Sequence, residues 1–290
     1  MSVVRVLQQS FTGFAERTGA LATLDPIASK IHALTTPVFG PDANRSLRDV
    51  LYGTWLGHPL HPVVVDLPIG FWTSSAVLDL LGLDDAADTT LKLGTITSVA
   101  AAATGVAQWY DLEQMEEPRR IGTAHALLNT AATLSFAGSW CLRGADHRSA
   151  GKAASLLGLT LASAGGLLGG DLAYRLGIGV SRDAFEEAPA EWTSITPLAN
   201  LPEGELVPLE HDGLSLVALR QGDDVLVTSA ICTHVGAPLN EGELSGTCVT
   251  CPWHGSVFDL ADGSVVHGPA TTPLQSFEVR TRDGQVEIRA

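Results

Sequence analysis

The 290-residue sequence has little cysteine and little positive charge. Four cysteines are too few for the disulfide framework that holds small secreted domains together. The 17 Lys and Arg side chains stand against 32 Asp and Glu, so the formal net charge is −15. This balance argues against nucleic acid as a partner, because binding to a phosphate backbone needs clustered cations. With 45% hydrophobic and 17% charged residues, the chain is not disordered.

The first 55 residues lack the features of an export signal. They show neither a basic start followed by an apolar run and a small-residue cleavage site, nor a twin-arginine pair near Met1. Instead, residues 3–14 and 27–34 form short amphipathic patterns. We expect residues 1–55 to be an amphipathic N-terminal arm, either on a membrane surface or packed against the rest of the chain.

Charge and hydropathy divide the chain into two parts near residue 182. Residues 1–182 hold 15 acidic and 13 basic side chains, whereas residues 183–290 hold 17 acidic and only 4 basic ones. The long apolar runs all lie in the first part, and the mean hydropathy of the whole chain is +0.20. These differences predict two main domains joined by an acidic linker at residues 181–191.

Four apolar stretches dominate the first part, at residues 61–83, 92–110, 122–142 and 153–174. Each has about the 20 residues with which a helix crosses the hydrocarbon core of a bilayer. Short polar connections at 84–90, 111–120 and 143–152 favour antiparallel neighbours. We therefore expect residues 56–180 to form an all-α transmembrane four-helix bundle, with a soluble four-helix bundle as the alternative.

Several ionisable side chains lie within or beside these apolar stretches: His58, His61, Asp66, His125 and Asp171. Because such groups are unfavourable in a bilayer, they usually pair or take part in function. The functional interpretation is a site for haem b, a metal or a quinone built from these residues. The alternative is hydrogen bonding between helices, with Asp66 or Asp171 paired to His125 or Asn129.

Three segments of this part resemble a known family. Residues 57–70 read Gly-His-Pro-Leu-His-Pro-Val-Val-Val-Asp-Leu-Pro-Ile-Gly, residues 122–126 read Gly-Thr-Ala-His-Ala, and residues 169–174 read Gly-Gly-Asp-Leu-Ala-Tyr. These segments resemble motifs of the bacterial membrane family catalogued as DUF2231. The resemblance covers roughly residues 50–180 and implies a four-helix membrane domain without assigning it an activity.

The second part contains two Cys and His motifs at a defined spacing. Cys232-Thr233-His234 is followed, after sixteen residues, by Cys251-Pro252-Trp253-His254. Two thiols and two imidazoles can bind zinc or an iron–sulfur cluster. A structural zinc finger prefers two cysteines in one segment and two histidines in another. One Cys and one His in each loop instead favour a two-iron cluster, with both thiolates on one iron and both imidazoles on the other.

At these residues the chain resembles the Rieske [2Fe–2S] family, whose pattern is Cys-x-His, about sixteen residues, then Cys-x-x-His. The flanking residues that agree with the pattern are Gly236, Gly255-Ser256 and Gly268-Pro269-Ala270. The resemblance covers about residues 190–290. It implies a [2Fe–2S] cluster whose first iron is bound by Cys232 and Cys251 and whose second iron is bound by His234 and His254.

Short strand-like runs separated by turn signals surround the two motifs. They lie at residues 206–209, 214–219, 225–228, 247–250, 276–279 and 286–288. This pattern predicts a small antiparallel all-β Rieske-type iron–sulfur domain at residues 192–290, and makes the whole chain multidomain.

Four further residues are expected around the cluster: Trp253, Ser256, Phe258 and Pro269. Rieske proteins of cytochrome bc complexes carry a disulfide between the two metal loops, but this sequence has Ala237 and Trp253 at those places. The same proteins place a Ser and a Tyr hydroxyl against the cluster; Ser256 matches the first, and Phe258 replaces the second. Imidazole-ligated clusters span roughly −150 to +300 mV, and we expect the lower half of that range.

Together these features lead us to expect a membrane-tethered protein that passes single electrons to or from a reductase, an oxygenase or a membrane electron-transfer component. One alternative is a membrane oxidoreductase whose helical domain binds haem or quinone; another is a structural or redox-sensing cluster protein. An electron-carrying component is favoured over a stand-alone enzyme. Because clusters are assembled in the cytoplasm, we expect a multi-pass protein of the bacterial inner membrane with the cluster domain on the cytoplasmic face.

Overall fold

The structure, a computed structural model, describes residues 3–40 and 43–290 and divides into two compact units. The first unit contains the described residues up to Ala43 together with Leu60–Ile178, and the second contains Asn44–Pro59 together with Gly179–Ala290. The Leu60–Ile178 part of the helical unit is therefore inserted between the two chain segments that form the second unit.

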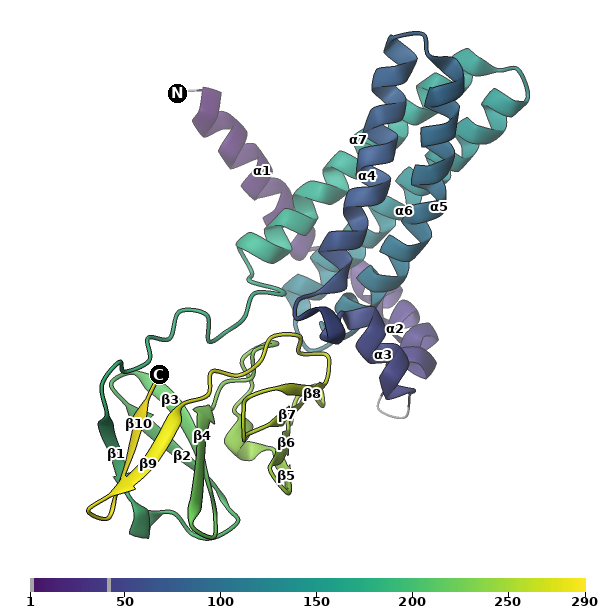
Figure 1. Cartoon of the computed structure of the whole chain (residues 1–290). Coiled ribbons are helices and arrows are strands. Elements are labelled where there is room, and N and C mark those ends of the chain that lie inside the picture. The colour runs from purple at the N-terminus through teal and green to yellow at the C-terminus, as the bar shows by residue number, and fades with distance from the viewer. Residues whose placement is uncertain (1–2, 41–42) are drawn as a thin grey trace. The chain divides into compact units, whose positions relative to one another are not determined.

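The first unit is built on four long antiparallel helices, α4 (Leu60–Leu80), α5 (Asp84–Tyr110), α6 (Glu116–Gly144) and α7 (Arg148–Tyr174), shown in Figure 1. Their shared core includes Trp72 of α4, stacked on Phe136 of α6 with ring centroids 4.1 Å apart. Two N-terminal helices, α1 (Val3–Gly19) and α2 (Asp25–Phe39), pack against α6. Asp25 holds α2 there, because its carboxylate accepts hydrogen bonds from Arg119 and Arg120.

The helices extend further than the apolar stretches predicted. The expected connections at 84–90 and 143–152 are mostly helical, and the observed ones are residues 81–83 and 145–147. Acidic side chains favour the first turn of a helix, where they interact with the positive end of the helix dipole. Asp84 and Asp85 begin α5, and Glu116 and Glu117 begin α6, so polar residues mark helix ends as well as loops.

Only part of the expected membrane bundle is confirmed. Within the described residues, α4 and α7 are the two helices long and apolar enough to cross a bilayer. The prediction of four spanning helices is therefore confirmed as a four-helix arrangement but not as four candidate spans. The reason is that α5 and α6, beyond their charged first turns, are rich in Ala, Thr and Ser, and their mean hydropathy is too low for a candidate span.

The second unit contains three antiparallel sheets. One sheet has the order β1-β10-β9, with β1 Thr193–Pro197, β9 Glu278–Arg282 and β10 Gln285–Arg289. The next has β2 Leu206–His211, β3 Leu214–Gln221 and β4 Asp224–Ser229. The last has β5 Glu243–Ser245, β6 Cys248–Thr250, β7 Val257–Asp259 and β8 Val265–His267. The all-β prediction is thus confirmed, while β1, β5, β7 and β8 were not foreseen. The last three have only three residues each, too few to show a period of two.

The N-terminal segment contributes a helix to this β unit. Helix α3 (Arg45–Tyr52) begins at Asn44, whose side chain accepts a hydrogen bond from the Leu47 N–H, and ends at Gly53 with φ of 89°. A short 3-10 turn, η2 (Thr54–Leu56), follows. Residues 44–55 therefore group with the β unit, whereas we expected residues 1–55 to act as one arm.

The segment expected to be an acidic linker also packs on the β unit. Asp183 is buried, and its carboxylate accepts hydrogen bonds from the Gln275 N–H and the Ser181 hydroxyl. Further along, the Ala290 N–H donates to the Pro189 carbonyl. Residues 181–191 thus lie along the domain instead of extending freely, because their polar groups find partners there.

Candidate metal centre

Two loops of the β unit share one backbone design. In the first, which follows β4, the Cys232 N–H donates to the Ala237 carbonyl and the Gly236 N–H donates back to Cys232. In the second, between β6 and β7, the Cys251 N–H donates to Ser256 and the Gly255 N–H donates to Cys251. Gly236 and Gly255 have φ of 89° and 75°, a left-handed conformation that favours glycine. Each loop therefore turns tightly just after its histidine.

The four predicted ligands form two pairs at these loops. The Cys232 and Cys251 side chains are buried, at 1% and 3% exposed, and their sulfurs are hydrogen-bonded to each other. The rings of His234 and His254 lie 5.1 Å apart, centroid to centroid, at 90°. The structure thus forms one sulfur pair and one imidazole pair.

Backbone amides and burial prepare these side chains for metal binding. The hydrogen bond from Cys232 lowers the pKa of the Cys251 thiol to about 6, with further N–H donors from residues 253–255, while burial opposes the shift. Contact with Cys251, and then burial, raises the pKa of Cys232. Desolvation lowers the pKa of His234 to about 3, helped by His254 and Arg182. Neutral imidazole and a readily formed thiolate are the ligating forms.

The donor set fits a two-iron cluster. Two protein ligands for each of two irons is the arrangement that the paired loops offer. When bound, such a cluster accepts and releases one electron at a time.

The other four residues expected at the cluster line the loops in different ways. Ser256 is fully buried, and its hydroxyl accepts a hydrogen bond from the Ala270 N–H at 2.9 Å. It thereby ties the second ligand loop to the segment after Pro269, which follows a cis peptide bond. Phe258 is fully buried in the core that includes both cysteines. Trp253 is 55% exposed beside His254, so it is a surface residue next to a ligand.

A side chain that the sequence did not suggest holds the loop around Pro269 from outside. One oxygen of the Asp49 carboxylate, on α3, accepts a hydrogen bond from the Gly268 N–H, and the other lies 2.9 Å from Nδ1 of His267. Both distances are 2.9 Å, and Asp49 is 218 residues from His267 in sequence. No local pattern could signal such a contact.

The residues proposed for a site in the helical domain are only partly brought together. The rings of His61 and His125 lie 6.3 Å apart. Asp66 is exposed on α4, and Asp171 is paired with Arg175 one turn later on α7. His58 belongs to the other unit, where its exposed ring bonds the Pro59 carbonyl.

The sheets, the paired loops and the Cys2His2 donor set define an iron–sulfur electron-transfer domain. The chain belongs to the Rieske [2Fe-2S] domain family, whose model matches residues 191–278, and carries its [2Fe-2S] cluster. A second model, for the predicted membrane protein family DUF2231, matches residues 57–182. Both resemblances seen in the sequence are thereby confirmed.

Curated relatives of the cluster domain are electron-transfer components. The ferredoxin CarAc of Metapseudomonas resinovorans is 33% identical over 33% of this chain and 92% of its own length. The anthranilate 1,2-dioxygenase ferredoxin subunit of Burkholderia cepacia is 30% identical over 36% of this chain and 95% of its own. The cytochrome b6-f complex iron-sulfur subunit of Chlorobaculum tepidum is 26% identical over 33% of this chain and 51% of its own.

Replacing Phe258 by Tyr should raise the midpoint potential of the cluster. A hydroxyl that donates to a ligand sulfur stabilises the more negative reduced state, and one net hydrogen bond corresponds to about 20–60 mV for a one-electron couple. The measurement is a redox titration followed by electron paramagnetic resonance. Phe258→Leu, which adds no hydroxyl, is the control and should show no such rise. An unchanged potential in an intact Phe258→Tyr protein would contradict the assignment of this position.

Removing the Asp49 carboxylate should loosen the Pro269 loop and shorten the lifetime of the cluster. Asp49→Ala leaves the buried Gly268 N–H without its acceptor, which should lower the free energy of unfolding by about 1–3 kcal/mol. We expect faster bleaching of the visible absorbance in urea, with Asp49→Asn intermediate because its amide oxygen still accepts one hydrogen bond. Asp223→Ala, an exposed acid in the β3–β4 turn, should bleach at the wild-type rate. Equal rates for Asp49→Ala and Asp223→Ala would show that α3 does not support the loop.

Proposed function

We propose that this chain is a membrane-anchored electron carrier that passes single electrons through its [2Fe-2S] cluster to or from a redox partner. The observation that supports it best is the fusion of a Rieske ligand cage to apolar helices that the protein does not cover. The 18-residue apolar windows of α4 and α7 are only 17% and 22% buried. A core helix of a water-soluble protein would be mostly buried, so these surfaces need lipid or another apolar cover.

The exposed side chains of these helices are large and apolar. Ile69 and Leu80 of α4 are 53% and 88% exposed, and Leu156 of α7 is 67% exposed. On this proposal the helical unit is a multi-pass anchor in the bacterial inner membrane. The chain re-enters the unit at Leu60 and leaves it at Ile178 after an even number of long helices, so we propose that both junctions lie on one side of the membrane. We place that side in the cytoplasm, where clusters are assembled.

The partner is proposed to be a redox protein with a basic docking surface. Residues 183–290 have 17 acidic and 4 basic side chains, and complementary charge speeds the encounter of two proteins. Trp253 offers an exposed aromatic surface next to the ligand His254, which suits the centre of a small docking area. The relatives named above make an oxygenase, a reductase or a membrane electron-transfer complex the partner classes to test.

Native membranes provide the test of this function. The protein should stay in the pellet after alkaline carbonate washing, contain two irons and two acid-labile sulfides per chain, and titrate as a one-electron couple. Cys251→Ser should keep the membrane location but lose the cluster. Release by carbonate would refute the anchor, zinc without sulfide would refute the cluster, and a cluster that cannot be reduced and reoxidised would favour a structural or sensing role.

A second candidate function is an oxidoreductase whose helical domain binds haem or quinone, and the histidine pair favours it. Nδ1 of His61 lies 3.0 Å from the Ala101 carbonyl, and Nδ1 of His125 lies 2.7 Å from the Gly165 carbonyl. If each Nδ1 carries the proton, both Nε2 atoms keep a lone pair; Nε2 of His125 lies 3.4 Å from the Asn129 amide nitrogen and would have to be released to a ligand. A Soret band or co-purified quinone that disappears in His125→Leu, while the cluster signal remains, would support this function; purification of neither would exclude it.

A further inference from the structure

We infer that the four long helices are two copies of one helical hairpin, α4–α5 and α6–α7, which pair as an acidic copy and a basic copy. Helix α4 ends at Leu80 and α6 at Gly144, a separation of 64 residues. The same separation relates both ends of α5 (Asp84–Tyr110) to those of α7 (Arg148–Tyr174). This inference concerns the helical unit alone and does not depend on the proposed electron transfer.

The turn inside each hairpin has the same backbone conformation. Gly82 has φ of 73°, and Asp146, 64 residues later, has φ of 62°. A positive φ is uncommon for a residue with a side chain, so its retention at Asp146 reflects the shape of the turn. The closing hydrogen bond also repeats: Leu83 N–H donates to Leu78, and His147 N–H donates to Leu142, at 3.0 and 2.8 Å.

Packing within each hairpin repeats at the same separation. A serine of the first helix donates to a carbonyl of the second, an aromatic ring of the first helix covers a glycine of the second, and a histidine ring does the same nearer the other end. In the first hairpin these contacts are Ser75–Ala87, Trp72–Gly94 and His61–Gly105; in the second they are Ser139–Gly151, Phe136–Gly158 and His125–Gly169. Each histidine also places Nδ1 near a carbonyl 40 residues later.

If a two-fold axis relates the hairpins, a residue close to the axis contacts the equivalent residue of the other hairpin, 64 positions away. Three pairs of side chains from α4 and α6 do so. They are His61 with His125, Trp72 with Phe136, and Asp79 with Arg143. Because each hairpin contains two helices, both copies run in the same direction, and the axis relating them runs along the helices. Parallel repeats of this kind occur in membrane proteins.

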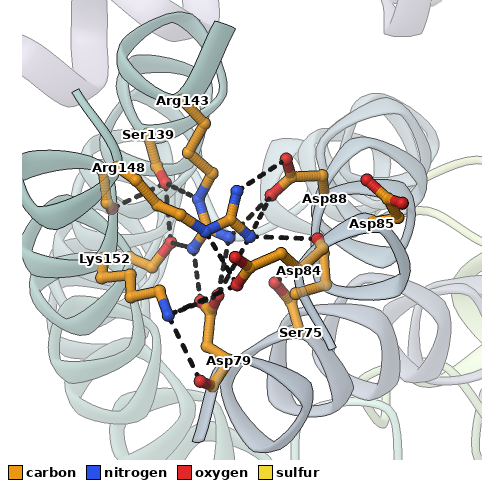
Figure 2. A network of polar contacts seen from close by, with 12 residues as sticks. Ser75, Asp79, Asp84, Asp85, Asp88, Ser139, Arg143, Arg148 and Lys152 are labelled. Atoms are coloured by element: carbon orange, nitrogen blue, oxygen red, sulfur yellow. Dashed lines mark hydrogen bonds and ion pairs between the residues drawn. The ribbon is translucent and has the colours of Figure 1, made fainter. Parts of the chain in front are cut away.

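The turn ends of the two copies carry opposite charge at equivalent positions. Asp79, Asp84 and Asp88 of the first hairpin correspond to Arg143, Arg148 and Lys152 of the second. Figure 2 shows these six side chains converging in one network. Two identical hairpins would bring like charges together here, whereas the acidic and basic copies neutralise each other.

Arg143 is the centre of this network. Its side chain is only 2% exposed, and its guanidinium donates to both oxygens of Asp79 and to Asp88. Ser139 and Ser155 accept its remaining hydrogen bonds. A buried cation with no counter-charge is strongly destabilising, so Arg143 makes pairing with an acidic hairpin obligatory. The interface between the hairpins, where α5 packs on α6 and α4 on α7, therefore requires two hairpins of the same kind with opposite turn charge.

Exchange of the turn charges tests the equivalence of the two copies in the full chain in detergent. The half exchange replaces only the three acids, by Asp79→Arg, Asp84→Arg and Asp88→Lys, and so places six cations together at the turn ends. It should lower the melting temperature by about 10 °C or more. The full exchange should melt within a few degrees of wild type. The new Arg at position 79 can then donate to Ser75, as Arg143 donates to Ser139 in the wild-type chain. The full exchange combines Asp79→Arg, Asp84→Arg, Asp88→Lys, Arg143→Asp, Arg148→Asp and Lys152→Asp.

A chimera provides the second, more demanding test. Residues 60–110 are replaced by a copy of residues 124–174 with Asp at the three turn positions; because the two segments are equally long, no connection changes. This chain should elute as a single species and melt cooperatively, while the same chimera with its basic turn residues should not. The cluster absorbance, read in parallel, reports the other unit. Two results would each overturn the inference when both chimeras also fail to fold. One is a full exchange that melts at as low a temperature as the half exchange; the other is a half exchange that melts at the wild-type temperature.

Discussion

The convergence of two thiols and two imidazoles from two loops is the constraint on which the β unit depends. Each loop returns its backbone onto its own cysteine, so the ligands are held before any metal arrives. The rest of the unit supports that arrangement: Ser256 ties one loop to the segment after Pro269, and Asp49 holds the same segment from the other side. A centre held in this way changes little in shape between its two charge states, which suits electron transfer.

The helical unit has a different organising interaction, which is the neutralisation of charge between its halves. The apolar contact between α4 and α6, a stack of Trp72 on Phe136, carries no charge and so does not distinguish an acidic from a basic partner. The ion pairs of Arg143 are selective, because they require an acidic partner at one depth and one end of the bundle. Stability and pairing specificity therefore come from different parts of the same surface.

Local signals in the sequence were enough for the [2Fe-2S] cluster and for the division into a helical part and an antiparallel β part. The spacing of Cys232, His234, Cys251 and His254 is a property of two short loops, and the apolar runs revealed four helices. Helix ends were misplaced because charged residues cap helices as readily as they fill loops. The docking of α3 could not be foreseen, since Asp49 and Gly268 are 219 residues apart. The repeated hairpin was also hidden, because its most informative positions have reversed charge.

The interruption of the β unit by the helical unit has a consequence for biogenesis. Residues 44–59 leave the ribosome before the four long helices α4–α7, and their partners from residue 179 onward leave it after them. The cage around the metal centre thus cannot be completed until the intervening helices have been synthesised. Maturation of the centre therefore follows synthesis of the long helices, and a ribosome that stalls within them leaves a product that cannot acquire iron.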